Sequence, residues 1–181
     1  MATGPGAAAA RRWIAAMAAV AALLMFGATF LPWIGTNTED GGSTSITGWG
    51  GITGSSGIAG TNLNDVLDGD GTYRPGLIGL IFGAVTLITA ITVAAVAGGV
   101  RPHRVSAAVL VLCGLVTTGW GLYRALVPGD ANVFQSGDAA AGPGPWVTAL
   151  GGALAIGAGA LLLTGRIDPP ARPTRRPIQP R

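Results

Sequence analysis

Four long apolar runs constrain this chain more than any other feature of its sequence. They cover approximately residues 13–34, 75–100, 105–127 and 145–165. Each run has close to the roughly 20 apolar residues that a helix needs to cross a bilayer. Because backbone polar groups in lipid must be satisfied internally, such runs favour helices. We therefore predict an all-α fold, a four-transmembrane-helix antiparallel bundle that occupies residues 11–165.

The composition agrees with a membrane protein. Of the 181 residues, 49% are hydrophobic and 10% are charged, whereas soluble domains carry about 25% charged residues. The basic residues are all arginines that lie beside apolar runs rather than on one basic face, so nucleic acid is not a predicted partner. The single cysteine, Cys113, excludes a disulfide within the chain.

The arginines also predict the topology. With four crossings, all of them except Arg74 and Arg124 fall on one side, and the positive-inside rule places that side in the cytoplasm. Both termini are then cytoplasmic, and the protein is expected in the cell (plasma) membrane. Arg11 and Arg12 before an apolar run are also typical of a secretory signal. That run is long and lacks a small-x-small cleavage site, so we interpret it as a retained helix.

The segments outside the runs are polar or of low complexity. The predicted outer loops cover residues 35–74 and 128–144, and the first is long and rich in glycine. Within it, residues 43–49 alternate as in a short strand, whereas the many glycines disfavour long regular strands. Asn62 is expected to cap a short helical turn.

The two ends of the chain lack a pattern typical of a packed core. Residues 1–10 are rich in Gly and Ala, and residues 166–181 are rich in Pro and Arg. We predict that both segments are disordered on the cytoplasmic side.

Aromatic residues lie at most of the predicted helix ends, as in the interfacial belt of membrane proteins. The predicted interface anchors are Trp13 on the cytoplasmic side and, on the outer side, Trp33, Tyr73, Trp120, Tyr123 and Trp146. Pro32 is expected to kink or end the first helix near the outer interface. Arg124 is expected to extend to the interface rather than act as a functional charge.

Trp49 lies alone among glycines in the first outer loop. Two interpretations are open for it. It folds back to cover the bundle, or it is a contact for a partner. The first is favoured because a lone aromatic side chain gains most from burial.

Small residues recur at a spacing of four in two of the predicted helices, which places them on one helix face. The predicted helix-packing residues are Gly79, Gly83, Gly151, Ala155 and Gly159. Such faces allow close approach of neighbouring helices in lipid. Packing within one bundle is favoured over a dimer face.

No catalytic, cofactor-binding or metal-ligating set is predicted. The single histidine, His103, is far in sequence from Cys113, and the spacing of Asp65, Asp68 and Asp70 fits a turn better than a calcium loop. The central parts of the four runs contain no ionisable residue, although ion-coupled transporters usually need one there.

Several short motifs resemble a known group of proteins. They are Phe30-Leu31-Pro32-Trp33, Gly69-Asp70-Gly71, Gly144-Pro145-Trp146 and Gly151-Gly152-Ala153-Leu154. The membrane region resembles small four-helix bacterial membrane proteins common in actinobacteria, and this resemblance implies location and layout but no activity. The layout is also similar to that of claudins, whose loop cysteine pair is missing here, so a barrier function does not follow.

The sequence therefore predicts a non-enzymatic multi-pass membrane protein without cofactor, embedded in the lipid bilayer. Its predicted role is structural or accessory, with the outer loop in contact with an envelope component or a larger membrane complex. The alternative is a small transporter or channel subunit that acts as a homo-oligomer through its glycine faces.

Overall fold

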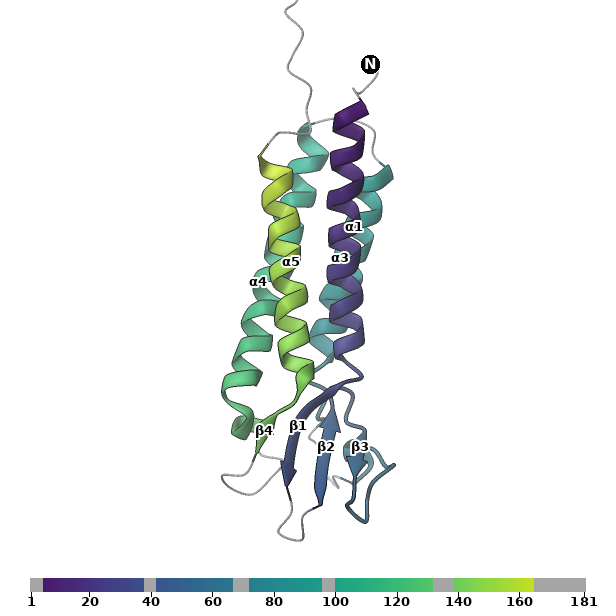
Figure 1. Ribbon diagram of the computed structural model, residues 1–181, viewed down its shortest axis with the longest axis vertical. Helices are drawn as coiled ribbons and strands as arrows, with labels where there is room; N and C mark the ends of the chain where they lie inside the picture. The colour runs from purple at the N-terminus through teal and green to yellow at the C-terminus, as the bar shows by residue number, and fades with distance from the viewer. Residues whose placement is uncertain (1–4, 38–41, 67–71, 96–99, 132–138, 165–181) are drawn as a thin grey trace, which may run out of the picture.

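The chain forms an elongated helical bundle with a small β-sheet at one end (Figure 1). A computed structural model describes residues 5–37, 42–66, 72–95, 100–131 and 139–164. The four long helices are α1 (Pro5–Ala28), α3 (Leu77–Ala95), α4 (Val100–Leu126) and α5 (Pro143–Leu163). Each contains a segment long and apolar enough to cross a membrane, which makes this a multi-pass membrane protein.

The four helices pack in a ring. Helix α1 contacts α3 and α5, and α4 contacts the same two neighbours. The buried centre consists mainly of small side chains, and Ala18, Ala21 and Ala155 are fully inaccessible to solvent. In lipid, apolar surface alone does not drive helices together, so close backbone approach has to supply the packing energy.

The predicted helix-packing residues face helices of the same chain. A Cβ atom on Gly79 would lie 3.1 Å from the carbonyl oxygen of Met25, and Gly83 faces the same turn of α1. Gly151, on α5, also faces α1. One turn later on α5, Ala155 packs against Ala21 and Met25 of α1. Gly159 faces α4, with the Ala107 carbonyl oxygen 2.8 Å from its added Cβ. These positions therefore serve contacts within one bundle.

The prediction of an all-α fold is confirmed for the four membrane-length helices but is incomplete, because both predicted outer loops contribute strands. The strands are β1 (Pro32–Asn37), β2 (Ser43–Thr47), β3 (Ile52–Gly54) and β4 (Ala140–Ala141). They form one antiparallel sheet in the order β3-β2-β1-β4. The expected alternation at residues 43–49 is β2, and the strands are short, as the glycines predict.

One face of the sheet has its own apolar core. Ile34, Ile46 and Ile52 are paired across three strands, and each is 2% exposed. Leu63 packs against them from the short helix α2 (Leu63–Val66). The predicted Asn62 cap is confirmed, since the Asn64 backbone N–H donates to Asn62 Oδ1 at 3.0 Å.

Several predicted helix boundaries differ from the structure. The first helix ends at Ala28 rather than at residue 34, because Pro32 begins β1 and lacks the N–H that would continue a helix. Residues 5–10 are helical rather than disordered. Helix α4 begins at Val100 rather than 105, with Pro102 in its first turn, where proline is well tolerated. The C-terminal segment 166–181 lies outside the described residues.

Trp33 is not the interface anchor that the sequence predicts. Its side chain is 2% exposed, and its Nε1–H donates to the Ala28 carbonyl at 2.7 Å, at the end of α1. The Trp33 carbonyl accepts from the Gly142 backbone N–H at 3.1 Å. An added Cβ on Gly48 or Gly144 would collide with the indole. Trp33 therefore joins the end of α1, the β2–β3 turn and the start of α5.

We predict that Trp33→Phe destabilises the protein by about 1–3 kcal/mol, because it removes a buried donor to a backbone carbonyl. The free energy of unfolding in mixed micelles measures this. Trp146 is 49% exposed, so Trp146→Phe is the matched control, with an effect within about 0.5 kcal/mol. Equal effects of the two substitutions would contradict the central position of Trp33.

We predict that Gly159→Ala destabilises the bundle by about 1–3 kcal/mol, since the new methyl group would lie 2.7 Å from Val111 Cγ2. Gly119 has nothing within 4 Å of its added Cβ. Gly119→Ala should therefore leave the thermal midpoint unchanged or raise it through helix propensity. A loss of stability for Gly119→Ala as large as that for Gly159→Ala would refute the packing argument.

Candidate functional site at the sheet end of the bundle

A groove opens between the start of α3 and the end of α4, at the sheet end of the bundle. Its volume is about 460 Å³, and we call it the interfacial groove. The residues that line it are Thr72, Tyr73, Arg74, Pro75, Leu77, Ile78, Trp120, Arg124 and Asp130. They come from the segment before α3, from the first turn of α3, from the last turns of α4 and from the 3-10 helix η1 (Pro128–Ala131).

Arg124 is the central charged residue of the groove. Its side chain is only 9% exposed. The guanidinium carbon lies 5.9 Å from the centre of the Tyr73 ring and 5.7 Å from that of Trp120. Its Nη2 donates to the Tyr73 hydroxyl at 3.4 Å. The cation is therefore held between two aromatic rings, which is a favourable electrostatic arrangement.

Arg124 does not extend freely into solvent, because its side chain is buried between those rings. Trp120 lies one turn before Arg124 on α4, so both share a helix face. Tyr73 comes from a segment 51 residues away. The Arg124–Trp120 spacing was the one signal in the sequence that would have pointed to this site.

Two further hydrogen bonds fix the walls of the groove. The Trp120 Nε1–H donates to the Pro75 carbonyl at 2.9 Å, which ties α4 to the entry of α3. The Tyr123 hydroxyl donates to Asp130 Oδ2 at 2.6 Å, which holds η1 against α4. Tyr123 and Trp120 also pack together, with ring centres 5.9 Å apart.

A second arginine extends the groove towards the sheet. Arg74 is exposed, and its guanidinium carbon lies 5.1 Å from the centre of the Trp49 ring. Trp49 belongs to the β2–β3 turn and remains 37% exposed. Trp49 therefore packs on an arginine of its own loop. It is partly buried by this contact, but it does not cover the helical bundle.

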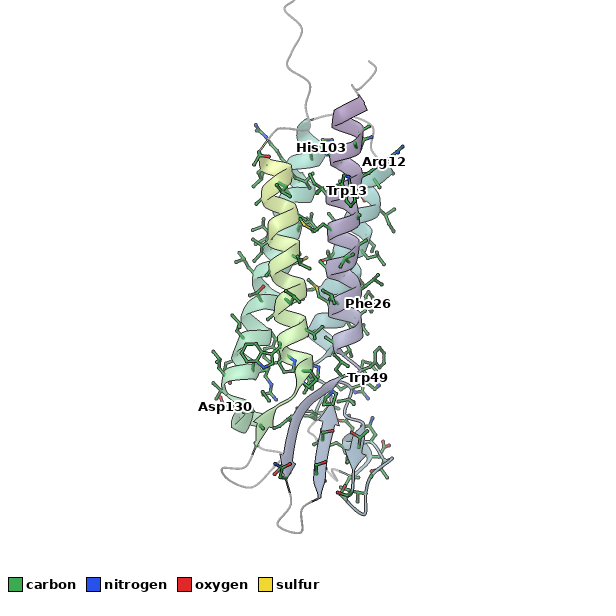
Figure 2. The ribbon with its side chains drawn as sticks, in the orientation of Figure 1. Arg12, Trp13, Phe26, Trp49, His103 and Asp130 are labelled. Carbon is green, nitrogen blue, oxygen red and sulfur yellow. The ribbon has the colours of Figure 1, made fainter. Side chains whose placement is uncertain are left out.

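The other predicted anchors differ in exposure. Trp13 is 77% exposed on α1, at the end opposite to the sheet, and Trp146 is 49% exposed at the start of α5. Figure 2 shows Arg12, Trp13 and His103 near one end of the bundle and Trp49 and Asp130 near the other. Of the aspartates considered for calcium, Asp65 lies in α2, and Asp68 and Asp70 lie outside the described residues.

The sheet carries a second, smaller groove of about 200 Å³, lined in part by Gly35, Ser45 and Ala140 on the face away from its isoleucines. Gly35 is paired there with Ser45 and Ala140, and Ser45 is paired with Thr53. The Ser45 and Thr53 hydroxyl oxygens are 2.8 Å apart. We call the surface formed by these four residues the polar sheet face.

The histidine and the cysteine of the chain are both buried in α4. His103 and Cys113 are ten positions apart, which corresponds to about 15 Å along a helix axis. They therefore do not form a nucleophile–base pair within the chain.

Comparison with known proteins does not assign a family. No model of a protein family matches the chain, and no curated protein is significantly similar in sequence. Function therefore has to be inferred from the geometry of this chain.

Burial raises the pKa of the Tyr73 hydroxyl, and the neighbouring Arg124 guanidinium lowers it by less. Tyr73 and Tyr123 are the two tyrosines of the chain, so Tyr123→Phe isolates the phenolate absorbance of Tyr73. We predict that Tyr73 in this variant titrates above the ordinary value of about 10. Adding Arg124→Gln should raise the pKa further, because it removes the charge that stabilises the phenolate.

The sign of the linked stability change follows from the raised pKa. The folded state holds the Tyr73 proton more tightly than the unfolded state does, so this contribution is present below pH 10 and is lost as the pH rises through the folded pKa. A downward shift of the Tyr73 pKa on Arg124→Gln would contradict the contact between these residues.

Proposed function

We propose that this chain is a non-enzymatic accessory or structural component of the plasma membrane, which contacts an envelope component or a larger membrane complex through its sheet. The observation that carries this proposal is that two segments far apart in sequence form one sheet on one end of the bundle. A preformed surface of this kind suits contact with a partner.

The sheet is fixed to the helices by several backbone hydrogen bonds. The Gly48 N–H donates to the Leu31 carbonyl at 3.3 Å, and the Gly76 N–H donates to the Gly48 carbonyl at 2.9 Å. The Thr29 hydroxyl donates to the Gly76 carbonyl at 3.1 Å. A surface held in this way is preorganised, which lowers the entropic cost of binding a partner.

The polar sheet face is the contact surface that we propose. Its side chains are small, and Thr53 and Ala140 are exposed. The opposite face is occupied by the isoleucine core. A surface of small side chains allows a partner to approach closely and to form hydrogen bonds with the Ser45 and Thr53 hydroxyls.

The proposed orientation places the sheet outside the cytoplasm. Arg11 and Arg12 lie near the N-terminal end of α1 and Arg104 near the start of α4, at the end of the bundle opposite to the sheet (Figure 1). Arginines gather on the cytoplasmic side of membrane proteins. We therefore propose that the N-terminal ends of α1 and α4, which carry these arginines, face the cytoplasm.

The geometry supports the alternative, an oligomeric transporter or channel, less well. That hypothesis requires the glycine faces for association between copies, whereas Gly79, Gly151 and Gly159 contact helices of their own chain. The centre of the bundle is also filled, with Met25 and Thr117 fully inaccessible to solvent.

Photocrosslinking in native membranes tests this proposal. We expect a crosslinking residue at Ser45 to trap one defined partner, because this position lies on the polar sheet face. The matched control is Leu112, which is 62% exposed on α4 within a candidate membrane span and should contact mainly lipid. An adduct between two copies of the chain, or identical products from both positions, would count against the accessory role.

A further inference from the structure

We propose that the interfacial groove binds the anionic phosphate group of a phospholipid headgroup. This site is separate from the polar sheet face and does not depend on the function proposed above. The inference combines the depth of the groove in the membrane, the unusual burial of Arg124 and the apolar residues at the groove rim.

The groove lies where a headgroup would be. Leu77 and Ile78 are the first two residues of α3, and Arg124 lies two residues before the end of α4. Both helices contain candidate membrane spans that end at this level, Leu77–Ala95 and His103–Leu126. The groove therefore opens at the boundary between the hydrocarbon layer and the headgroups.

Arg124 has unused capacity for hydrogen bonding. A guanidinium carries five N–H donors in a planar fork, and among the described residues Arg124 donates one hydrogen bond, at 3.4 Å, to Tyr73. No Arg124 nitrogen is among the fully buried, unpartnered side-chain atoms of the described residues, so its remaining N–H groups are accessible to a ligand in the groove. Phosphate oxygens fit the arginine fork with two parallel hydrogen bonds.

The remaining groove residues suit the same ligand. Arg74 and the hydroxyls of Thr72 and Tyr73 line the groove beside Arg124. Asp130 lines it too, but its Oδ2 already accepts the Tyr123 hydroxyl at 2.6 Å. With two arginines and one aspartate, the described ionisable residues of the lining carry one net positive charge.

The rim explains why we infer a lipid rather than a soluble phosphate. Leu77 lines the groove and is 38% exposed. Ile78 and Trp120 also line the groove. Apolar side chains next to a cationic pocket at this depth provide contacts for glycerol and for the first acyl carbons while the phosphate lies against the arginines.

Native mass spectrometry of the purified, delipidated full-length protein tests this inference. The probes are dioleoylphosphatidylglycerol, dioleoylglycerol, which lacks the phosphate, and inorganic phosphate. We expect the wild type to bind the phospholipid and to bind dioleoylglycerol at least about tenfold more weakly, as expected for the loss of charge-assisted hydrogen bonds. Arg124→Gln should weaken phospholipid binding by a similar factor.

Two matched variants keep the test informative. Arg74 is exposed, so Arg74→Gln removes its surface contact with Trp49 but no buried contact, and it should weaken phospholipid binding even if Arg124→Gln lowers stability. Arg104 is exposed near the opposite end of the same helix as Arg124, and Arg104→Gln should leave binding to the groove unchanged. Asp130→Asn should tighten binding, because it removes a negative charge from the lining.

Three results would overturn the proposal. They are equal binding of phosphatidylglycerol and dioleoylglycerol, unchanged phospholipid binding in both Arg124→Gln and Arg74→Gln, and binding of inorganic phosphate without binding of the phospholipid. Competition between inorganic phosphate and the phospholipid, lost in the Arg74→Gln variant, would support the phosphate as the recognised group.

Discussion

The arrangement of the sheet end depends on the buried indole of Trp33. One side chain contacts three parts of the chain, since it donates to the last carbonyl of α1 and fills the space that Gly48 and Gly144 leave open. A bulkier residue at either glycine would displace the indole. The hydrogen bond also ends α1 at a defined residue, so that β1 leaves the bundle in the direction that the sheet requires.

The four helices of the bundle are held together by a different kind of interaction. Helices in lipid gain no hydrophobic energy from contact, and here they approach closely where small residues such as Gly83, Gly152 and Gly159 face backbone or small side chains of neighbouring helices. The same principle limits what the bundle can do. Its centre is filled by packed side chains, and its distinctive polar surfaces lie at the sheet end, where the loops and helix ends meet.

Two surfaces with different chemistry therefore lie at one end of the molecule. The polar sheet face consists of small residues on a fixed backbone, and the interfacial groove consists of arginines between aromatic rings. The contact between Arg74 and Trp49 connects the groove with the β2–β3 turn.

The sequence by itself determined the features that depend on local patterns. Apolar runs of about 20 residues predicted the four membrane helices, alternation predicted β2, and Asn62 predicted the cap of α2. Only the tertiary structure decided the rest. Trp33 and Trp146 both follow a proline, yet one is buried and the other exposed. Strand β1 pairs with Ala140–Ala141, and Arg124 meets a ring 51 residues away. These contacts form because the helices bring segments together that are distant in sequence. A local sequence pattern cannot predict such contacts.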